Sequence, residues 1–290
     1  MKSRFAVSVL SWLARMPAPV ADATGRLIGR FVHRKGSRNQ RRTQINLALA
    51  YPDMPLKDRL ELERQSLKDL GEKAARLARV WVLGSENPDQ LRDPEDLDDW
   101  NQAIEAGEGM LLLVPHLGNW ELLGGWVAEH GVLNAMYRPA RLQGVDELIL
   151  NGRVAQGYQM HPTNVKGVAG LLKSLKKGEI VAVLPDQEPD LDGGEFAPFF
   201  GVPALTMTLA HKLAQKQPSA AVFIAAAVRL DARHYQVVLQ RLPGFGAQPT
   251  QAGLTQMNLA IESLVRRYPE QYQWEYKRFQ TRPDGEPSPY

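Results

Sequence analysis

Apolar positions change their spacing along the chain, and each spacing predicts a different element. Two continuous apolar runs, at 110–115 and 180–185, are typical of strands buried on both faces. Other apolar runs predict further strands at 133–137, 220–230 and 235–242. Between them, apolar residues recur every three or four positions. This period predicts helices at 120–130, 142–157, 165–177, 206–216 and 254–268.

Strands that alternate with helices predict an α/β fold, with a mixed, mostly parallel sheet flanked by helices. A helical region is predicted ahead of the sheet, at residues 37–83, with its longest helix from Leu56 to Leu83. Residues 84–108 predict loops with one short helix. Residues 186–203 are rich in Gly, Pro and Asp and predict a loop.

The N-terminal stretch has an apolar stripe of its own, because Phe5, Val9, Trp12 and Met16 recur at helical spacing. This stretch is far shorter than the roughly 20 apolar residues that a spanning helix needs. It therefore predicts a helix that lies in the membrane interface. The alternative is that residues 5–32 form two ordinary helices packed on the body. We divide the chain into a membrane-associating helical segment, 1–35, and a body, 36–290.

Charge is distributed unevenly around a net value of +3. The first 50 residues hold ten Lys or Arg and one acid, Asp22, which is a net charge of +9. Such a basic arm favours an anionic partner: a membrane surface, an acidic protein or nucleic acid. Nucleic acid is disfavoured, because no recognition motif accompanies the basic cluster between Arg30 and Arg42.

The absence of cysteine excludes disulfides, thiolate metal sites and a cysteine nucleophile. The six histidines lack the spacing of a zinc site, so no metal and no cofactor is expected. Phosphate-binding loops and serine-nucleophile elbows are absent from the sequence as well.

The segment VPHLGNWELLGGW, residues 114–126, carries the most chemistry. His116 follows a buried strand, Asn119 is a candidate N-cap, and Glu121 falls in the first turn of the next helix. In this arrangement the side chains of His116 and Glu121 can meet. A carboxylate on one imidazole nitrogen would make the other a general base towards a hydroxyl. The alternative is structural: a histidine at a strand end and a glutamate favoured by the helix dipole.

This strand–His-x4-Glu–helix unit resembles the glycerolipid acyltransferase superfamily, whose usual motif ends in Asp. Further blocks occur in the expected order and resemble the bacterial lipid A biosynthesis late (secondary) acyltransferases. These blocks are Asn46-Leu47, Tyr51-Pro52, Tyr137-Arg138-Pro139, Lys176 to Glu179, Pro185-Asp186-Gln187, Phe199-Phe200-Gly201 with Pro203 and Thr206, Pro269 to Trp274, Arg278-Phe279 and Thr281-Arg282-Pro283.

The resemblance implies transfer of an acyl chain from acyl carrier protein to the 3-hydroxyl of a hydroxyacyl chain on a phosphorylated lipid A precursor. His116 would be the general base and Glu121 its partner. Arg138, Asp186, Gln187 and Asn119 would contact substrate. The implied location is the cytoplasmic face of the inner membrane, with peripheral or monotopic attachment at its anionic surface.

Several readings stay open at this level. The acceptor could be a different lipid, namely a glycerolipid, a glycolipid or an aminolipid, or the chain could be a catalytically silent membrane-binding protein. Phe196, Phe199 and Phe200 could line an acyl groove or fill the core. Trp274, Arg278 and Arg282 match the family without an assigned role, and the acyl chain length does not follow from the sequence.

Overall fold

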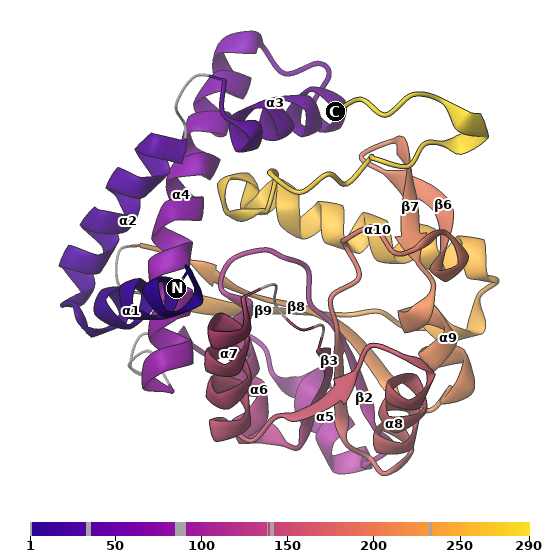
Figure 1. Ribbon diagram of the computed structural model, residues 1–290. Coiled ribbons are helices and arrows are strands. Elements are labelled where there is room, and N and C mark those ends of the chain that lie inside the picture. The colour runs from indigo at the N-terminus through magenta and orange to yellow at the C-terminus, as the bar shows by residue number, and fades with distance from the viewer. Residues whose placement is uncertain (1, 33–35, 85–90, 138, 140–141, 232–233) are drawn as a thin grey trace.

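The computed structural model describes residues 2–32, 36–84, 91–137, 139, 142–231 and 234–290 (Figure 1). Within these residues seven strands form one sheet, in the order β1-β9-β8-β2-β5-β3-β4. The strands are β1 (Leu91–Arg92), β2 (Met110–Leu113), β3 (Leu133–Tyr137), β4 (Gln159–Pro162), β5 (Ile180–Val183), β8 (Ala221–Arg229) and β9 (Tyr235–Arg241). All neighbouring pairs are parallel except β8 and β9. This confirms the expected α/β fold with a mixed, mostly parallel sheet.

Helices cover both faces of the sheet, which explains why its central strands are apolar along their whole length. Met110 and Leu112 of β2 pack with α5 (Asp98–Ala106) and α6 (Trp120–His130). Leu111 and Leu113 point to the other face. There they join the core formed with α8 (Val165–Lys176), α9 (Leu209–Lys216) and α10 (Thr250–Arg267).

The segment 186–203 differs from the loop that its composition predicts. It includes β6 (Gly194–Phe199), which pairs antiparallel with β7 (Val202–Met207), so that the following helix begins at Leu209. Pro198 and Pro203 stand opposite each other in this hairpin. Proline cannot donate to a ladder, so it lowers the strand signal, yet a two-stranded edge tolerates it. The short strands β1 and β4 also carry too little apolar sequence to be predicted.

Four helices precede the sheet: α1 (Lys2–Arg15), α2 (Ala18–Val32), α3 (Arg38–Ala50) and the long α4 (Leu56–Leu83). Helix α2 crosses α4 at a glycine contact, where a Cβ on Gly71 would lie 2.2 Å from the Gly25 carbonyl oxygen. Asp22 of α2 accepts two hydrogen bonds from Arg76 of α4, at 3.0 and 2.8 Å.

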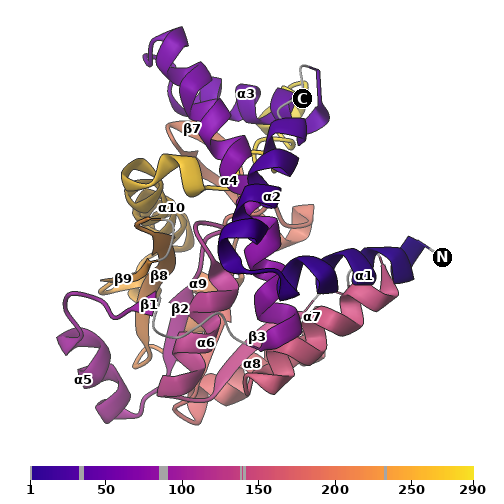
Figure 2. The ribbon, with the colours of Figure 1, turned by 90° about the vertical axis from the view of Figure 1, so that its left-hand side faces the viewer.

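Helix α1 packs on α4 and on α7 (Gln143–Ala155), and its N-terminal end extends away from the sheet (Figure 2). In the part of the chain that is described, no helix is long and apolar enough to cross a bilayer. The first two helices thus pack on the body. The division at residue 35 stays a prediction, since residues 33–35 lie outside the described residues.

Candidate active site

The loop that carries His116 leaves β2 at the carboxyl end of the sheet and is held from two sides. On one side, Asn119 donates its backbone N–H to Ala227 of β8 at 2.9 Å. On the other, Gln273 of the C-terminal segment donates to the His116 carbonyl at 3.1 Å. Gly118 makes the turn with a φ of +63°, and a Cβ there would lie 2.1 Å from the Ala227 oxygen. Only glycine fits this position, so Gly118 allows the loop to turn close against β8.

His116 is oriented by Asp186, which follows β5. Imidazole Nδ1 lies 2.8 Å from Asp186 Oδ1, and the His116 backbone N–H donates to Oδ2 at 2.8 Å. The carboxylate is buried and acceptor-only at neutral pH, so Nδ1 carries a proton and Nε2 presents its lone pair. This is the tautomer that a general base towards a hydroxyl requires.

The electrostatics keep Asp186 ionised. Burial by itself would raise the pKa of this carboxyl, but the charge and hydrogen bonds of His116 and the charge of Arg278 outweigh burial and lower the pKa below its ordinary value. Arg278 is buried and donates to the Leu205 carbonyl at 2.7 Å and to Thr206 Oγ1 at 3.0 Å. Arg278 thus binds the β6–β7 hairpin and also stabilises the negative charge of Asp186. Its sequence context did not indicate this role.

Glu121 does not form the expected contact with His116. Both of its carboxylate oxygens accept hydrogen bonds from Arg153 of α7, at 3.0 and 2.6 Å, and the glutamate is 1% exposed. From the first turn of α6 its side chain reaches α7, while the His116 imidazole turns to the loop after β5. Asp186 stands 70 positions beyond His116, so local spacing could not reveal the exchange of partners.

Two glutamine amides occupy the Nε2 side of the imidazole. Gln187 Nε2 lies 3.1 Å from His116 Nε2 and 3.0 Å from Gln273 Oε1. Since Nε2 of the histidine can only accept, the Gln187 amide donates to both neighbours. Gln187, which the resemblance predicts to contact substrate, lies at His116 Nε2. Gln273 belongs to the block from Pro269 to Trp274, and the sequence alone does not indicate its place in the site.

The other residues predicted to contact substrate, and the three phenylalanines, differ in where the structure places them. Asn119 caps α6, with its side-chain oxygen accepting from the Leu122 N–H at 3.1 Å, which confirms the N-cap prediction. Its amide nitrogen is buried without a partner among the described residues. Arg138 lies outside the described residues. Phe199 and Phe200 are buried in the main core, whereas Phe196 is half-buried.

The other C-terminal residues of the family blocks brace the site. Trp274 is buried and donates its indole N–H to the Pro269 carbonyl at 2.6 Å. Arg282 donates to the Pro203 carbonyl at 3.0 Å. Lys73 of α4 donates to the Gln271 carbonyl at 2.7 Å and lies over the Trp120 ring at 5.7 Å. These contacts hold the C-terminal segment against the His116 loop.

Two cavities of opposite character are each lined by a residue that contacts His116. A narrow apolar cavity of about 60 Å³ starts at Trp120, whose ring centroid is 5.1 Å from that of His116. Its walls include Leu133, Ala135 and Met136, and Glu121 and Arg153 also line it. A polar cavity of about 750 Å³ starts at Gln273, the partner of Gln187. In the described residues, no three His, Asp or Glu side chains are placed to hold a metal ion.

Comparison with known proteins gives one family over almost the entire chain. A sequence profile described as bacterial lipid A biosynthesis acyltransferase matches residues 3–281. The lipid A biosynthesis palmitoleoyltransferase of Escherichia coli (strain K12) is 29% identical over 289 residues, covering 99% of this chain and 93% of the relative. The lauroyltransferase of the same strain is 27% identical, covering 98% and 93%. The myristoyltransferase of that strain is 26% identical, covering 98% and 88%. These names specify three different acyl chains.

Proposed function

Because this chain belongs to the bacterial lipid A biosynthesis acyltransferase family, we propose that it transfers a fatty acyl chain from the thioester of acyl carrier protein to a 3-hydroxyl of a hydroxyacylated lipid A precursor. One observation carries the proposal. His116 Nδ1 is held by Asp186 at 2.8 Å, which leaves Nε2 as a base between an apolar and a polar cavity. Acyl chain and polar acceptor thus have separate approaches to the same nitrogen.

The reaction needs no nucleophile from the protein. His116 Nε2 takes the proton of the acceptor hydroxyl as its oxygen attacks the thioester carbonyl carbon. The C–O bond forms and the C–S bond of the tetrahedral intermediate breaks, after which the imidazolium gives its proton to the departing thiolate. General-base assistance of this kind contributes about 10²–10⁴-fold. Asp186 stabilises the imidazolium between the two proton transfers.

The developing oxyanion needs donors on the other side of the carbonyl carbon. The N-terminus of α6, one residue beyond Asn119, supplies free backbone N–H groups and the positive end of a helix dipole. The Gln187 amide, now on Nε2, is released when the acceptor hydroxyl takes its place there. In that state the amide is available to the oxyanion or to the acceptor.

The apolar cavity is the proposed start of the acyl-chain path. At about 60 Å³ it is smaller than the several hundred Å³ usual for a ligand pocket, so a chain enters by displacing mobile side chains such as Met136. Each CH₂ that leaves water there contributes about 0.8 kcal/mol. The Glu121–Arg153 ion pair lies in the wall of this path, where it is proposed to limit its depth.

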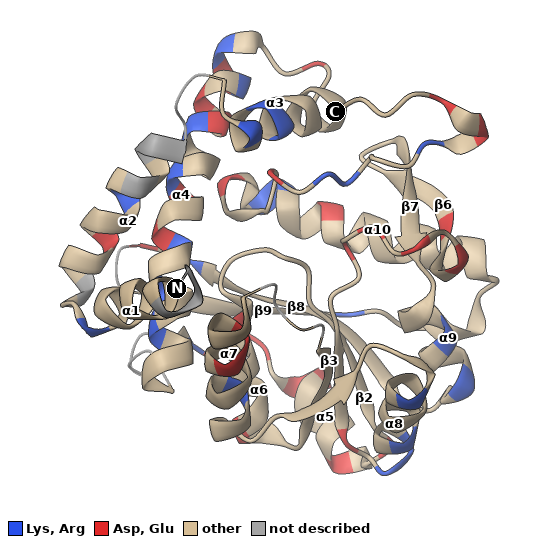
Figure 3. Cartoon of the chain, viewed as in Figure 1, with Lys and Arg blue, Asp and Glu red and all other residues tan. Residues whose placement is uncertain are grey.

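The N-terminal helices are proposed to attach the enzyme peripherally to the cytoplasmic face of the inner membrane. Phe5, Val9 and Trp12 of α1 are exposed, as are Val20 and Leu27 of α2. Such apolar side chains on helices too short to span are typical of interfacial binding. Arg38 and Arg41 are exposed on α3, where Figure 3 shows basic residues, and they suit anionic headgroups or an acidic carrier protein.

A comparison of acceptors tests the function. The full chain is incubated with one acyl carrier protein thioester and, in separate reactions, a hydroxyacylated lipid A precursor, a lysophospholipid and an aminolipid. We expect a gain of one acyl chain on the lipid A precursor alone. Acylation of another acceptor with none on the lipid A precursor would move the function within the superfamily. No acylation at all, beside an active relative as positive control, would leave a binding protein without turnover.

A further inference from the structure

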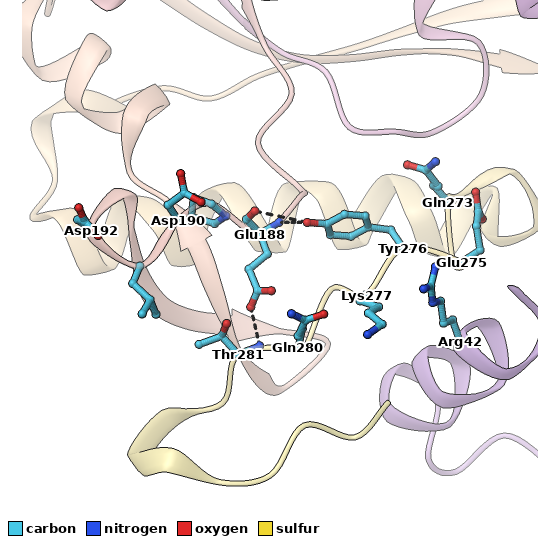
Figure 4. A pocket seen from close by; sticks show the side chains of 12 residues that line it. Arg42, Glu188, Asp190, Asp192, Gln273, Glu275, Tyr276, Lys277, Gln280 and Thr281 are labelled. Atoms are coloured by element: carbon cyan, nitrogen blue, oxygen red, sulfur yellow. Dashed lines mark hydrogen bonds between the residues drawn. The ribbon is translucent and has the colours of Figure 1, made fainter. Parts of the chain in front are cut away.

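The polar cavity next to His116 is formed by three segments that are distant in sequence. Glu188, Asp190 and Asp192 come from the loop after β5, Tyr276 and Lys277 come from the C-terminal segment, and Arg42 comes from α3 (Figure 4). At about 750 Å³ the cavity has the size of a ligand site. The proposed acyl transfer involves only one part of this cavity, its inner edge at Gln273.

Hydrogen bonds hold the segments that form this cavity in fixed positions. The Glu188 N–H donates to the Tyr276 hydroxyl at 3.0 Å, and Glu188 Oε1 accepts from the Thr281 N–H at 2.7 Å. These bonds, drawn in Figure 4, join the loop after β5 to the C-terminal segment. On the opposite wall, the Asn46 amide donates to the Trp274 and Tyr276 carbonyls, both at 2.6 Å. Arg42 precedes Asn46 by one helical turn and shares its face, so α3 holds the guanidinium at the cavity.

Charge in the cavity is divided between its two ends. Arg42 and Lys277 lie towards one end, and Asp190 and Asp192 lie at the other (Figure 4). Within the described residues, Arg42 forms no ion pair, although it is partly buried. The planar fork of an unpaired, partly buried guanidinium favours an oxyanion such as phosphate or carboxylate. Glu275 lies near Arg42, and burial raises the pKa of its carboxyl, which lessens its competition with such an anion.

The other end suits a different chemistry. Asp190 and Asp192 carry acceptor-only carboxylates that no protein donor satisfies among the described residues, and amides and a phenol hydroxyl lie between the two ends. Such a surface suits a neutral ligand rich in O–H and N–H donors. A sugar that carries an anionic group combines both chemistries within one molecule.

We propose that this polar cavity binds the anionic carbohydrate of the acceptor lipid, with Arg42 and Lys277 at its phosphate and Asp190 and Asp192 at its hydroxyl groups. The proposal rests on the proposed function, since it assigns the headgroup of the acceptor whose hydroxyl reaches His116. It explains why Gln187 and Gln273 lie between the cavity and Nε2. A headgroup seated here directs the attached acyl chains past these amides to the base.

Acceptor and donor kinetics test this assignment in the full chain. The acceptors are a bisphosphorylated, hydroxyacylated glucosamine disaccharide, its dephosphorylated form and methyl 3-hydroxytetradecanoate, which has no sugar. Arg42→Ala is expected to raise the KM for the phosphorylated acceptor about 10- to 100-fold, the range for a lost charged hydrogen-bond pair. The same change is expected to leave the KM for the thioester donor and for the sugar-free acceptor unaltered.

Asp190→Asn together with Asp192→Asn tests the hydroxyl end. This double variant is expected to raise the KM for both sugar acceptors about 3- to 30-fold, the loss of one or two ordinary hydrogen bonds, and not that for methyl 3-hydroxytetradecanoate. The matched controls are Arg64→Ala and Glu105→Gln, on exposed faces of α4 and α5, and both should leave the KM for every acceptor and for the donor unchanged. An unchanged acceptor KM in the cavity variants would overturn the proposal. So would a raised donor KM instead, which would assign the cavity to the carrier's pantetheine arm.

A binding measurement separates this inference from the catalytic one. The deacylated, phosphorylated disaccharide is titrated into the full-length His116→Ala variant, and binding is followed by calorimetry. Saturable binding that Arg42→Ala weakens about 10-fold or more supports the carbohydrate site whether or not the protein catalyses transfer. Absence of binding in a chain that still acylates the disaccharide lipid when His116 is present would refute the site and leave the proposed function standing.

Discussion

The imidazole of His116 depends on residues from three separate parts of the chain. Asp186 holds Nδ1, Gln187 and Gln273 lie on the Nε2 side, and Trp120 packs against the ring. Because the lowered pKa of Asp186 keeps this carboxylate ionised around neutral pH, the His116 imidazole stays in one tautomer. Stability that depends on this contact is present at neutral pH and is lost only as pH falls through the lowered pKa.

Asp186→Asn should therefore reduce kcat about 10²- to 10⁴-fold without unfolding the chain. The asparagine amide would place an N–H opposite Nδ1, so the imidazole proton would move to Nε2 and the base would be lost. Steady-state acyl transfer with saturating substrates measures the effect, with Glu105→Gln on an exposed face of α5 as control. Full activity in Asp186→Asn would show that the orienting carboxylate is a different one.

Buried Glu121 and partly buried Arg153 form an ion pair, so removing one charge should lower the free energy of unfolding more than removing both. Glu121→Leu leaves the Arg153 guanidinium buried without a partner, at a cost of about 3–5 kcal/mol in the free energy of unfolding. Glu121→Leu with Arg153→Met should recover most of this loss.

Urea unfolding followed by tryptophan fluorescence gives the comparison. Glu61→Leu serves as the control, because Glu61 pairs with Arg64 at the exposed surface and its loss should change little. A double variant as unstable as the single one would contradict the pairing as the main role of Glu121.

At the scale of elements, α2 and the loop that carries His116 are joined through α4. Asp22 of α2 binds Arg76 of α4, and Lys73 of the same helix donates to the Gln271 carbonyl. That carbonyl also accepts the Gly118 N–H at 3.2 Å. Deleting the first helices would therefore disturb the body as well as any membrane contact. Point substitutions on their exposed face are the cleaner test.

Phe5→Asp with Trp12→Asp should lower binding to vesicles that contain anionic phospholipid by at least about 100-fold. Each aromatic side chain contributes about 1.5–3 kcal/mol when it leaves water, and the added charges are repelled by the surface. Co-sedimentation with vesicles measures it. Leu259→Asp, at an exposed position of α10, is the matched control. Sedimentation of the double variant equal to the wild type would rule out α1 as the attachment.

Most elements could be predicted because their apolar period is long and regular. The helices α4 and α6 begin and end at the predicted residues, and the strands β2, β3 and β5 lie within the predicted runs. The β6–β7 hairpin could not be predicted, since Gly and Pro hide its strand signal. The Asp186–His116 contact was equally hidden, because parallel strands bring together loops that the sequence keeps 70 residues apart.

At the scale of the whole molecule, His116 lies near both the apolar cavity and the polar cavity. The apolar cavity runs between α6 and strands β2, β3 and β5, and the polar one lies between the C-terminal segment, α3 and the loop after β5. We expect the two proposed substrates, which differ in polarity, to approach His116 through these separate cavities. The names of the family relatives specify different acyl chains, so the apolar side is where they are expected to differ.

Filling the apolar cavity should shorten the preferred acyl chain. Ala135→Phe places a ring in its wall, so we expect the preference among saturated thioesters to move by several carbons towards shorter chains, with the shortest still transferred. Competition among mixed thioesters, read by mass spectrometry of the product, measures this. Ala169→Phe on the exposed face of α8 is the control. An unaltered chain-length profile in Ala135→Phe would place the acyl path elsewhere.

The most direct test of the account is a mass spectrum of a hydroxyacylated lipid A precursor after incubation with the purified chain and mixed acyl carrier protein thioesters. The account predicts a gain of one acyl chain with the wild type and none above background with His116→Ala, although both proteins fold and bind vesicles alike. Equal acylation by the two proteins would contradict the assignment of His116 as the base.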